Sequence, residues 1–247
     1  MQRLPVPVAI IFGLCALGVP LIAQDGAMHA PDGGTMQRVQ SIDIPATPNA
    51  PFSAVVTTEW TRIMPDGTTA TMKNHRTVAR DSSGRVFQER RYFSPDGDKQ
   101  VTRLSELDYQ DPNLHQMIVC RPEVQVCTEY RFDAPVAAVK LPQAGPLQNA
   151  SVSLEPLGQK MVGSLELVGS REVTTLKVGA IGNVQPQPIV KEFWYSPQLG
   201  INVSTKRMDP RASAMQGFEV GNISTAEPDL KLFQPPANYR VVKMDGQ

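Results

Sequence analysis

The 247-residue sequence is poor in the residues on which most enzymes and metal sites depend. It contains three histidines and three cysteines, and its 24 basic and 24 acidic residues cancel. A chain without net positive charge lacks the electrostatic field of a nucleic-acid-binding surface. No G-x-S-x-G or H-E-x-x-H motif occurs, so neither a nucleophile elbow nor a zinc-protease helix is indicated. No internal repeat of fixed length occurs, which argues against a solenoid or a propeller.

The ionisable residues form no recognisable catalytic or metal-binding set. The histidines are far apart: His29 lies in the expected linker, and solvated positions suit His75 and His115 better than metal ligation. Acidic residues such as Asp66 fall in turns, where aspartate stabilises the turn itself. The acidic residues expected in strands are Glu59, Glu89, Glu106 and Glu192. Two of these could face each other across a groove as in a glycosidase, although pairing with arginine is the commoner use. We predict no catalytic residue, no metal and no cofactor.

The first 23 residues have the three parts of a secretory signal. Arg3 supplies a positive charge, residues 4–23 are almost wholly apolar, and the small Ala23 directly precedes the polar Gln24. These features predict a signal peptide over residues 1–23 and export to the periplasm or beyond. The apolar run is close to the length of a membrane-spanning helix, so a retained N-terminal anchor is the alternative.

Two cysteines, Cys120 and Cys127, would remain after export, because Cys15 lies within the predicted signal. A hairpin turn centred between Glu123 and Val124 places them directly opposite each other. Cross-strand neighbours are close enough for a disulfide, and an oxidising compartment lets one persist. We therefore predict a Cys120–Cys127 disulfide. Two separate buried thiols are the alternative, and the spacing with no nearby histidine speaks against a metal site.

The rest of the chain reads as a linker followed by one β domain. Residues 24–50 are rich in Gly, Pro, Asp and Ala without any period, which predicts a flexible linker, with a short edge strand possible at 40–44. From residue 51 onward, apolar and polar residues alternate with period two. Pro-Asp-Gly turns at 65–67 and 95–97 separate the first runs. We predict a single, mainly antiparallel β domain over residues 51–247. It would be a curved sheet or an incomplete β-barrel with few short helices.

About ten strands are expected from the alternation. The expected ranges are 52–61, 68–80, 85–93, 99–107, a hairpin around Cys120 and Cys127, 157–163, 171–178, 189–195, 201–208, 215–223 and 240–244. Residues 134–152 lack a pattern and are expected to form the longest irregular stretch, the segment best suited to be a lid. Asp229 is expected to cap a single helical turn over residues 230–233.

Ordered motifs give the chain a resemblance to known families. The motifs are Leu157-Gly158 with Val162-Gly163, Glu192-x-Trp194-x-Ser196-Pro197-x-Leu199, Asp209-Pro210-Arg211 and Glu227-Pro228-Asp229-x-x-Leu232-Phe233-x-x-Pro236-x-x-Tyr239, with residues 50–54, 66–67 and 80–85 in the first half. The series resembles a set of uncharacterised secreted bacterial proteins, which implies no function. Strand order and the terminal Leu-Phe…Pro…Tyr element are similar, less closely, to periplasmic lipoprotein carriers of the LolA type and to RseB-type stress sensors. That resemblance implies a curved antiparallel sheet whose apolar concave face holds lipid. This chain lacks the clear helices that fill the concavity in that family.

Large apolar side chains could line a pocket, although packing in the core is their commoner role. The candidates are Trp60, Phe87, Phe93, Trp194, Tyr195 and Phe233, with Met72, Met117, Met161 and Met208. Export, β architecture and the missing catalytic set favour a non-enzymatic envelope protein that binds a lipid or other apolar or amphipathic ligand in a sheet concavity. One alternative is a protein-interaction or envelope-sensor module that pairs its strand edges with an envelope protein. The other alternative is a hydrolase with a carboxylate pair in a groove.

Overall fold

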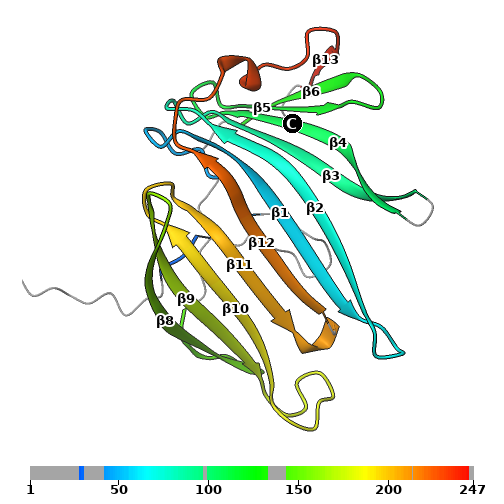
Figure 1. Cartoon of the computed structure of the whole chain (residues 1–247), viewed down its shortest axis with the longest axis vertical. Helices are drawn as coiled ribbons and strands as arrows, with labels where there is room; N and C mark the ends of the chain where they lie inside the picture. The colour runs from blue at the N-terminus through cyan, green and yellow to red at the C-terminus, as the bar shows by residue number, and fades with distance from the viewer. Residues whose placement is uncertain (1–27, 31–41, 97–98, 133–142, 213, 245–247) are drawn as a thin grey trace, which may run out of the picture.

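The protein is built on one open β-sheet (Figure 1). The computed structural model describes residues 28–30, 42–96, 99–132, 143–212 and 214–244. Its elements are β1 (Phe52–Ile63), β2 (Thr69–Arg80), β3 (Val86–Asp96), β4 (Lys99–Asp111), β5 (Gln116–Arg121), β6 (Val126–Arg131), β7 (Gly145–Pro146), β8 (Ala150–Val162), β9 (Leu165–Leu176), β10 (Gln187–Ser196), β11 (Ile201–Asp209), η1 (Pro210–Ala212), β12 (Ala214–Ser224), η2 (Leu230–Phe233) and β13 (Arg240–Lys243).

The strand order explains the shape of the sheet. The order is β13-β6-β5-β4-β3-β2-β1-β12-β11-β10-β9-β8-β7, so two meanders, β1–β6 and β7–β12, are joined where β1 pairs with β12. All neighbouring pairs are antiparallel except β13, which lies parallel to β6. The outermost strands β13 and β7 do not pair with each other, so the sheet is open. The predicted curved antiparallel sheet is confirmed, and it is not closed into a barrel (Figure 1).

The second meander differs most from the expected strands. The short strand expected at 157–163 is in fact the end of β8, which starts at Ala150 and forms a long hairpin with β9. The irregular stretch expected over 134–152 therefore ends earlier than predicted, and residues 133–142 lie outside the described residues. Pro156 and Gly158 obscured the strand signal, because both residue types are disfavoured in strands. The register of β8 against β9 shifts between them, which is how the strand accommodates both.

Two hydrophobic clusters lie on opposite faces of the sheet. Val78 and Val86 belong to one cluster, while their neighbours Ala79 and Phe87 belong to the other. Successive residues of a strand point to opposite faces, so each cluster occupies its own face of β2 and β3. We call the first the N-terminal core: Ile42, Ile44, Phe52, Ala54, Val56, Val78, Val86, Leu165, Leu167, Leu199, Ile201, Val203, Phe218 and Val220. The second is the C-terminal core: Ala79, Phe87, Tyr109, Cys120, Cys127 and Phe233.

The segment before β1 covers the N-terminal core. Ile42 and Ile44 are 2% and 4% exposed, so these residues are part of the core and the flexible linker predicted over 24–50 does not describe them. Residues 42–44 form no strand. Two isoleucines in a Gly- and Pro-rich stretch were too few to reveal this packing. Further upstream, the buried ring of His29 stacks on Phe193 with the ring centroids 3.9 Å apart.

Arg80 ties this covering segment to the sheet. Its fully buried guanidinium donates hydrogen bonds to the carbonyls of Ala50 and Pro45, both at 2.9 Å, and to the carbonyl of Leu199. It also lies 5.0 Å from the centre of the Phe52 ring. Burial lowers the pKa of Arg80 to about 10, so the group stays charged at neutral pH. One side chain of β2 thus holds the segment before β1 and the turn between β10 and β11 together.

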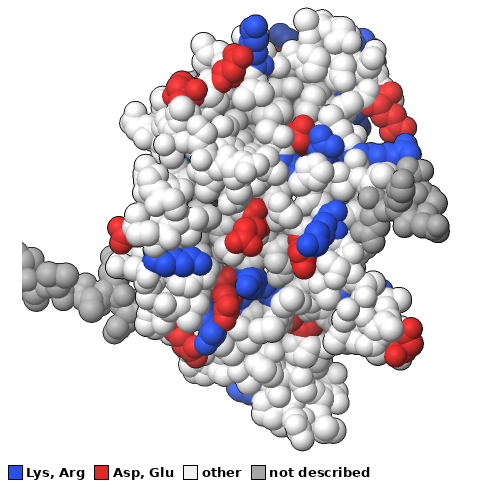
Figure 2. All heavy atoms as spheres, in the orientation of Figure 1, with Lys and Arg blue, Asp and Glu red and all other residues white. Residues whose placement is uncertain are grey.

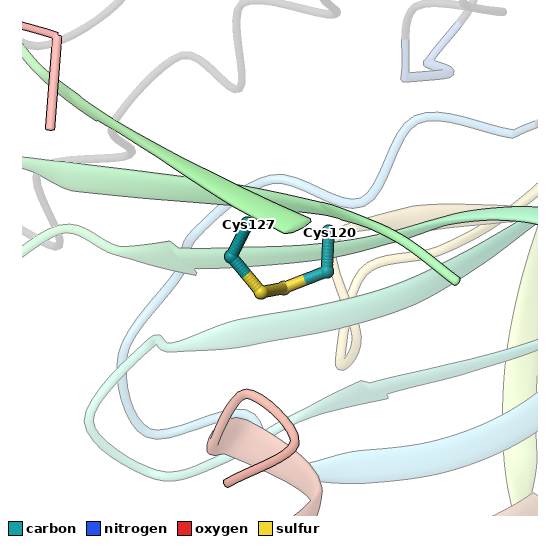
Figure 3. Close-up of a disulfide and its surroundings, with 2 residues drawn as sticks. All are labelled: Cys120 and Cys127. Atoms are coloured by element: carbon teal, nitrogen blue, oxygen red, sulfur yellow. A yellow bond between two sulfur atoms is a disulfide. The ribbon is translucent and has the colours of Figure 1, made fainter. Parts of the chain in front are cut away.

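The C-terminal core is covered by η2 and closed by a disulfide. Asp229 caps η2 by accepting a hydrogen bond from the amide of Lys231, as predicted, and Phe233 enters the core. Cys120 and Cys127 are directly opposite each other on β5 and β6 and are joined by an S–S bond of 2.01 Å (Figure 3). The predicted disulfide and its hairpin register are therefore confirmed.

Candidate ligand-binding cavity

The face that carries the N-terminal core changes from apolar to charged over β2 to β5. On β2, Arg76 and Asn74 follow Val78 at intervals of two and therefore share its face. Across the neighbouring strands, Gln88 pairs with Val78 and Asp108 pairs with Gln88, so both lie on this face as well. The polar half of the face is thus continuous with the apolar half.

The sheet splits between β2 and β3 in this polar half of the face. The two strands pair only at Val78, Ala79 and Arg80, although each continues well beyond these pairs. Figure 1 shows β2 and β3 diverging from there toward their far ends. Side chains bridge the start of the split. The amide of Thr77 donates to Glu89 Oε2 at 2.9 Å, and Asn74 Nδ2 donates to the carbonyl of Arg91 at 2.8 Å.

A cavity of about 570 Å³ opens at the split, and we call it the β2–β3 cavity. This volume lies within the usual range for small-ligand sites. Its lining residues are Val56, Thr58, Asn74, His75, Arg76, Arg90, Arg91, Tyr92, Phe93, Ser105, Glu106, Asp108, Met117 and Val119. They include Asn74, His75 and Arg76, successive residues of β2 whose side chains point alternately to the two faces of the sheet. The cavity therefore reaches into the gap between the two strands.

Arg76 stands at the border between the apolar and charged halves. It is 6% exposed and donates to Gln88 Oε1 at 2.7 Å and to the carbonyl of Ile42 at 2.8 Å. Burial, together with repulsion from Arg90, lowers the pKa of Arg76 to about 10. The guanidinium remains protonated at neutral pH, so the cavity contains a desolvated positive charge beside the end of the covering segment.

Asp108 is the most unusual group in the cavity. It is 4% exposed, and its Oδ2 accepts a hydrogen bond from Arg90 Nε at 2.7 Å. Its Oδ1 is buried and has no hydrogen-bond partner among the described residues. Burial raises the pKa of Asp108, opposed by the hydrogen bond and charge of Arg90. Leaving a buried acceptor of this kind unpaired costs about 1–3 kcal/mol, so a donor that reached Oδ1 would be bound favourably.

The cavity combines these polar groups with an apolar wall. Val56, Met117 and Val119 supply the wall, and a second buried acceptor, Asn74 Oδ1, also lacks a partner among the residues described. Positive and negative side chains are interspersed over the face of the molecule seen in Figure 2, with no large patch of one sign. The arrangement suits a ligand that presents N–H or O–H donors on one side and apolar groups on the other.

The two carboxylates that line the cavity are both engaged with arginines. Glu106 and Asp108 are two residues apart on β4. Asp108 pairs with Arg90 at 2.7 Å, and Glu106 contacts Arg121 at 3.5 Å. This is the cross-strand pairing that competes with a catalytic role for strand carboxylates. Among the described residues, no group of three or more His, Cys, Asp and Glu could hold a metal ion.

The residues singled out in the sequence are distributed over several sites. Phe93, Met117 and His75 line the cavity. Phe87 and Phe233 belong to the C-terminal core, and Trp194 packs against the N-terminal core. The polar residues that define the cavity, Asn74, Arg76, Arg90 and Asp108, were not predicted. One sequence signal could have identified these residues. Asn74 and Arg76 are polar, although they lie on the face of the strand that is apolar at Val78.

Several solved structures align with this chain, at low sequence identity and low TM-score. No protein-family model and no curated protein matches the chain. An uncharacterised conserved protein from Thermus thermophilus aligns at 10% identity over 79% of this chain and 91% of that one, with a TM-score of 0.37. The Pseudomonas aeruginosa MucA/MucB complex aligns at 13% identity over 78% of this chain and 59% of that one, with a TM-score of 0.36. A Vibrio parahaemolyticus domain named for outer-membrane lipoprotein sorting aligns at 6% identity over 73% and 88%, with a TM-score of 0.26.

These neighbours are of the kinds that the sequence resemblance named, namely uncharacterised bacterial proteins and LolA-like envelope proteins. At these TM-scores they carry no argument about what this chain binds. Within the described residues, no helix is long and apolar enough to cross a membrane. The predicted signal peptide, residues 1–23, lies outside the described residues.

Proposed function

We propose that this chain is an exported, non-enzymatic envelope protein that binds an amphipathic ligand in the β2–β3 cavity. The observation that carries the proposal is Asp108, a buried carboxylate whose Oδ1 has no partner among the described residues and which lines the cavity. Buried polar groups in folded proteins are normally hydrogen-bonded. An acceptor left unpaired at a cavity wall is therefore a group suited to meet a ligand donor.

The shape of the face limits how apolar the ligand can be. In the apolar half, Ile42 and Ile44 pack with the core residues of the sheet and are almost fully buried, so the chain itself occupies the apolar surface that a lipid would need. The open half holds the charged groups Arg76, Arg90 and Asp108. A purely apolar ligand would exclude water from these charges and would leave Asp108 Oδ1 without a donor, at considerable cost. The ligand is therefore amphipathic, with its apolar part against Met117 and Val119.

Native mass spectrometry of protein purified from the envelope tests this function. Wild-type protein is expected to carry a bound molecule. Asp108→Leu removes the acceptor but keeps the approximate volume, and it should lower occupancy about ten-fold, the equivalent of one charged hydrogen bond. Glu155→Gln removes an exposed carboxylate on β8 and should leave occupancy unchanged. The absence of any adduct on wild-type protein, or equal occupancy in Asp108→Leu, would contradict the proposal.

A further inference from the structure

The geometry points to a specific kind of ligand: we infer that the split between β2 and β3 docks an extended polypeptide segment, which pairs through its backbone with the edge of β2. This inference rests on the proposed function and names the class of its ligand. Its starting point is the unequal pairing of β2. That strand pairs with β1 along its whole length, Thr69–Arg80, but with β3 only from Val78 to Arg80.

The free edge of β2 presents a regular series of backbone groups to the split. The amide of Thr77 points toward β3, because Glu89 Oε2 accepts its hydrogen bond. In an antiparallel sheet, alternate residues direct both N–H and C=O to the same side. The backbone groups of Thr71, Lys73 and His75 therefore also face the split, and no described strand pairs with them there.

Side chains replace the missing backbone ladder at the start of the split. Glu89 binds an amide of β2, and Asn74 binds the carbonyl of Arg91 on β3. Both strands thus present unpaired backbone groups to the same gap, and flexible side chains satisfy one group on each. An extended peptide offers N–H and C=O groups in the alternation that these edges require, which a lipid does not.

The cavity beside this edge complements such a peptide. The buried acceptors Asp108 Oδ1 and Asn74 Oδ1, which have no partner within the described part of the chain, can receive peptide or side-chain N–H groups. Every second side chain of an extended segment points to the same face, and here that face holds Val56, Met117 and Val119. The partner is therefore an extended segment with apolar side chains at alternate positions.

The β2 edge carries little of the protection that exposed edges usually have. Proline, inward charges and bulges commonly block such edges. Between Thr69 and Thr77 there is no proline, and β2 pairs with β1 without a bulge. The inward charge of this stretch, Arg76, is held by Gln88 and by the carbonyl of Ile42. Its exposed charge, Lys73, forms an ion pair with Glu59 of β1 at 2.8 Å, on the side away from the split. The edge is consequently available for strand addition.

A synthetic peptide of about ten residues, alternating valine and threonine with a lysine at each end, serves as the probe on the full chain. Binding is expected to slow amide hydrogen exchange at Thr71, Lys73 and His75. The matched control is the same peptide with alternate amides N-methylated, which cannot donate to the edge and should not bind. Equal binding of the N-methylated peptide, or unchanged exchange at these three amides, would overturn the inference.

A pair of substitutions separates backbone pairing from side-chain effects. Lys73→Pro removes the N–H that faces the split and leaves the pairing with β1 intact, so it should weaken peptide binding about ten-fold, as for one lost hydrogen bond. Lys73→Ala keeps the N–H and should bind as wild type. If neither substitution changes affinity, the peptide does not pair with β2. If no peptide binds but the Asp108-dependent adduct is present and is a lipid, the inference fails while the proposed function stands.

Discussion

The same face of the sheet is closed in one half and open in the other. Over β1, β11 and β12, the residues of the N-terminal core are almost fully buried together with Ile42 and Ile44 of the segment before β1. Over β2 to β5, the face carries Arg76, Arg90 and Asp108 around a cavity of about 570 Å³. The two halves meet where Arg76 binds the carbonyl of Ile42. The chain thus uses its own N-terminal segment to fill the apolar half and leaves the polar half accessible.

The contrast separates stability from binding. The closed half buries apolar surface and backbone carbonyls, and it is expected to dominate the free energy of unfolding. The open half holds desolvated charges and unpaired acceptors, which cost stability and offer interactions to a ligand. Substitutions in the two halves should therefore have opposite profiles, with large stability losses in one and binding losses in the other.

The largest effect is expected from breaking the closed half at Arg80. Arg80→Met leaves the buried carbonyls of Pro45, Ala50 and Leu199 without their donor, which should lower the free energy of unfolding by about 4 kcal/mol. Urea denaturation measures the loss. Arg62→Met at the exposed end of β1 is the control and should cost less than about 0.5 kcal/mol. A loss below about 1 kcal/mol in Arg80→Met would show that the hydrogen bonds of Arg80 are not needed for stability.

Truncating a side chain of the segment before β1 should have the next largest effect on stability. Ile44→Ala deletes buried apolar volume and should cost about 3 kcal/mol. Asp43→Ala, one residue away but outside the core, should cost less than about 1 kcal/mol. Equilibrium denaturation of both variants gives the comparison. Equal, small losses would mean that the segment before β1 does not pack on the sheet in solution.

The disulfide on the opposite face offers a third, smaller effect. Replacing Cys120 and Cys127 by alanine should cost about 2 kcal/mol, because the bond closes a short loop. Reducing the wild-type protein should produce the same loss. Amide exchange is expected to speed up more in β5 and β6 than at Val56 and Ile201, because local opening adds to global unfolding in the hairpin. Equal acceleration at all of these positions would show that the two cores open only together.

The smallest stability effect is expected at Asp108, and its sign depends on pH. Because burial raises its pKa, the folded protein holds this proton more tightly than the unfolded chain does. Asp108 therefore disfavours folding increasingly as pH rises through and above its usual range. Asp108→Asn removes this dependence, so the variant should gain stability relative to wild type between about pH 3 and pH 7. The gain should stay below about 1 kcal/mol, since the lost pairing with the half-exposed Arg90 offsets it. Thermal denaturation at both pH values checks the sign, and a relative loss on raising the pH would contradict it.

Local patterns predicted the parts of the fold that depend on neighbouring residues. The alternation from Phe52 to Trp60, the Cys120–Cys127 register and the cap at Asp229 all follow from short stretches of chain. The cavity depends on contacts between distant segments, which no local pattern encodes. Arg76 meets Ile42 and Gln88 only because the covering segment and the split bring them together. The same holds for the pairing of β1 with β12, which joins the two meanders.

Methyl-resolved NMR of the full chain, titrated with the amphipathic probe 1-anilinonaphthalene-8-sulfonate, tests the central claim most directly. The probe carries an N–H donor, an anionic group and apolar rings, which match Asp108, the arginines and the apolar wall of the cavity. Saturable shifts are expected at the methyl groups of Val56, Met117 and Val119, and they should be weakened in Asp108→Leu. Shifts confined to Ile44 and Ile201, or no saturable binding at all, would contradict it.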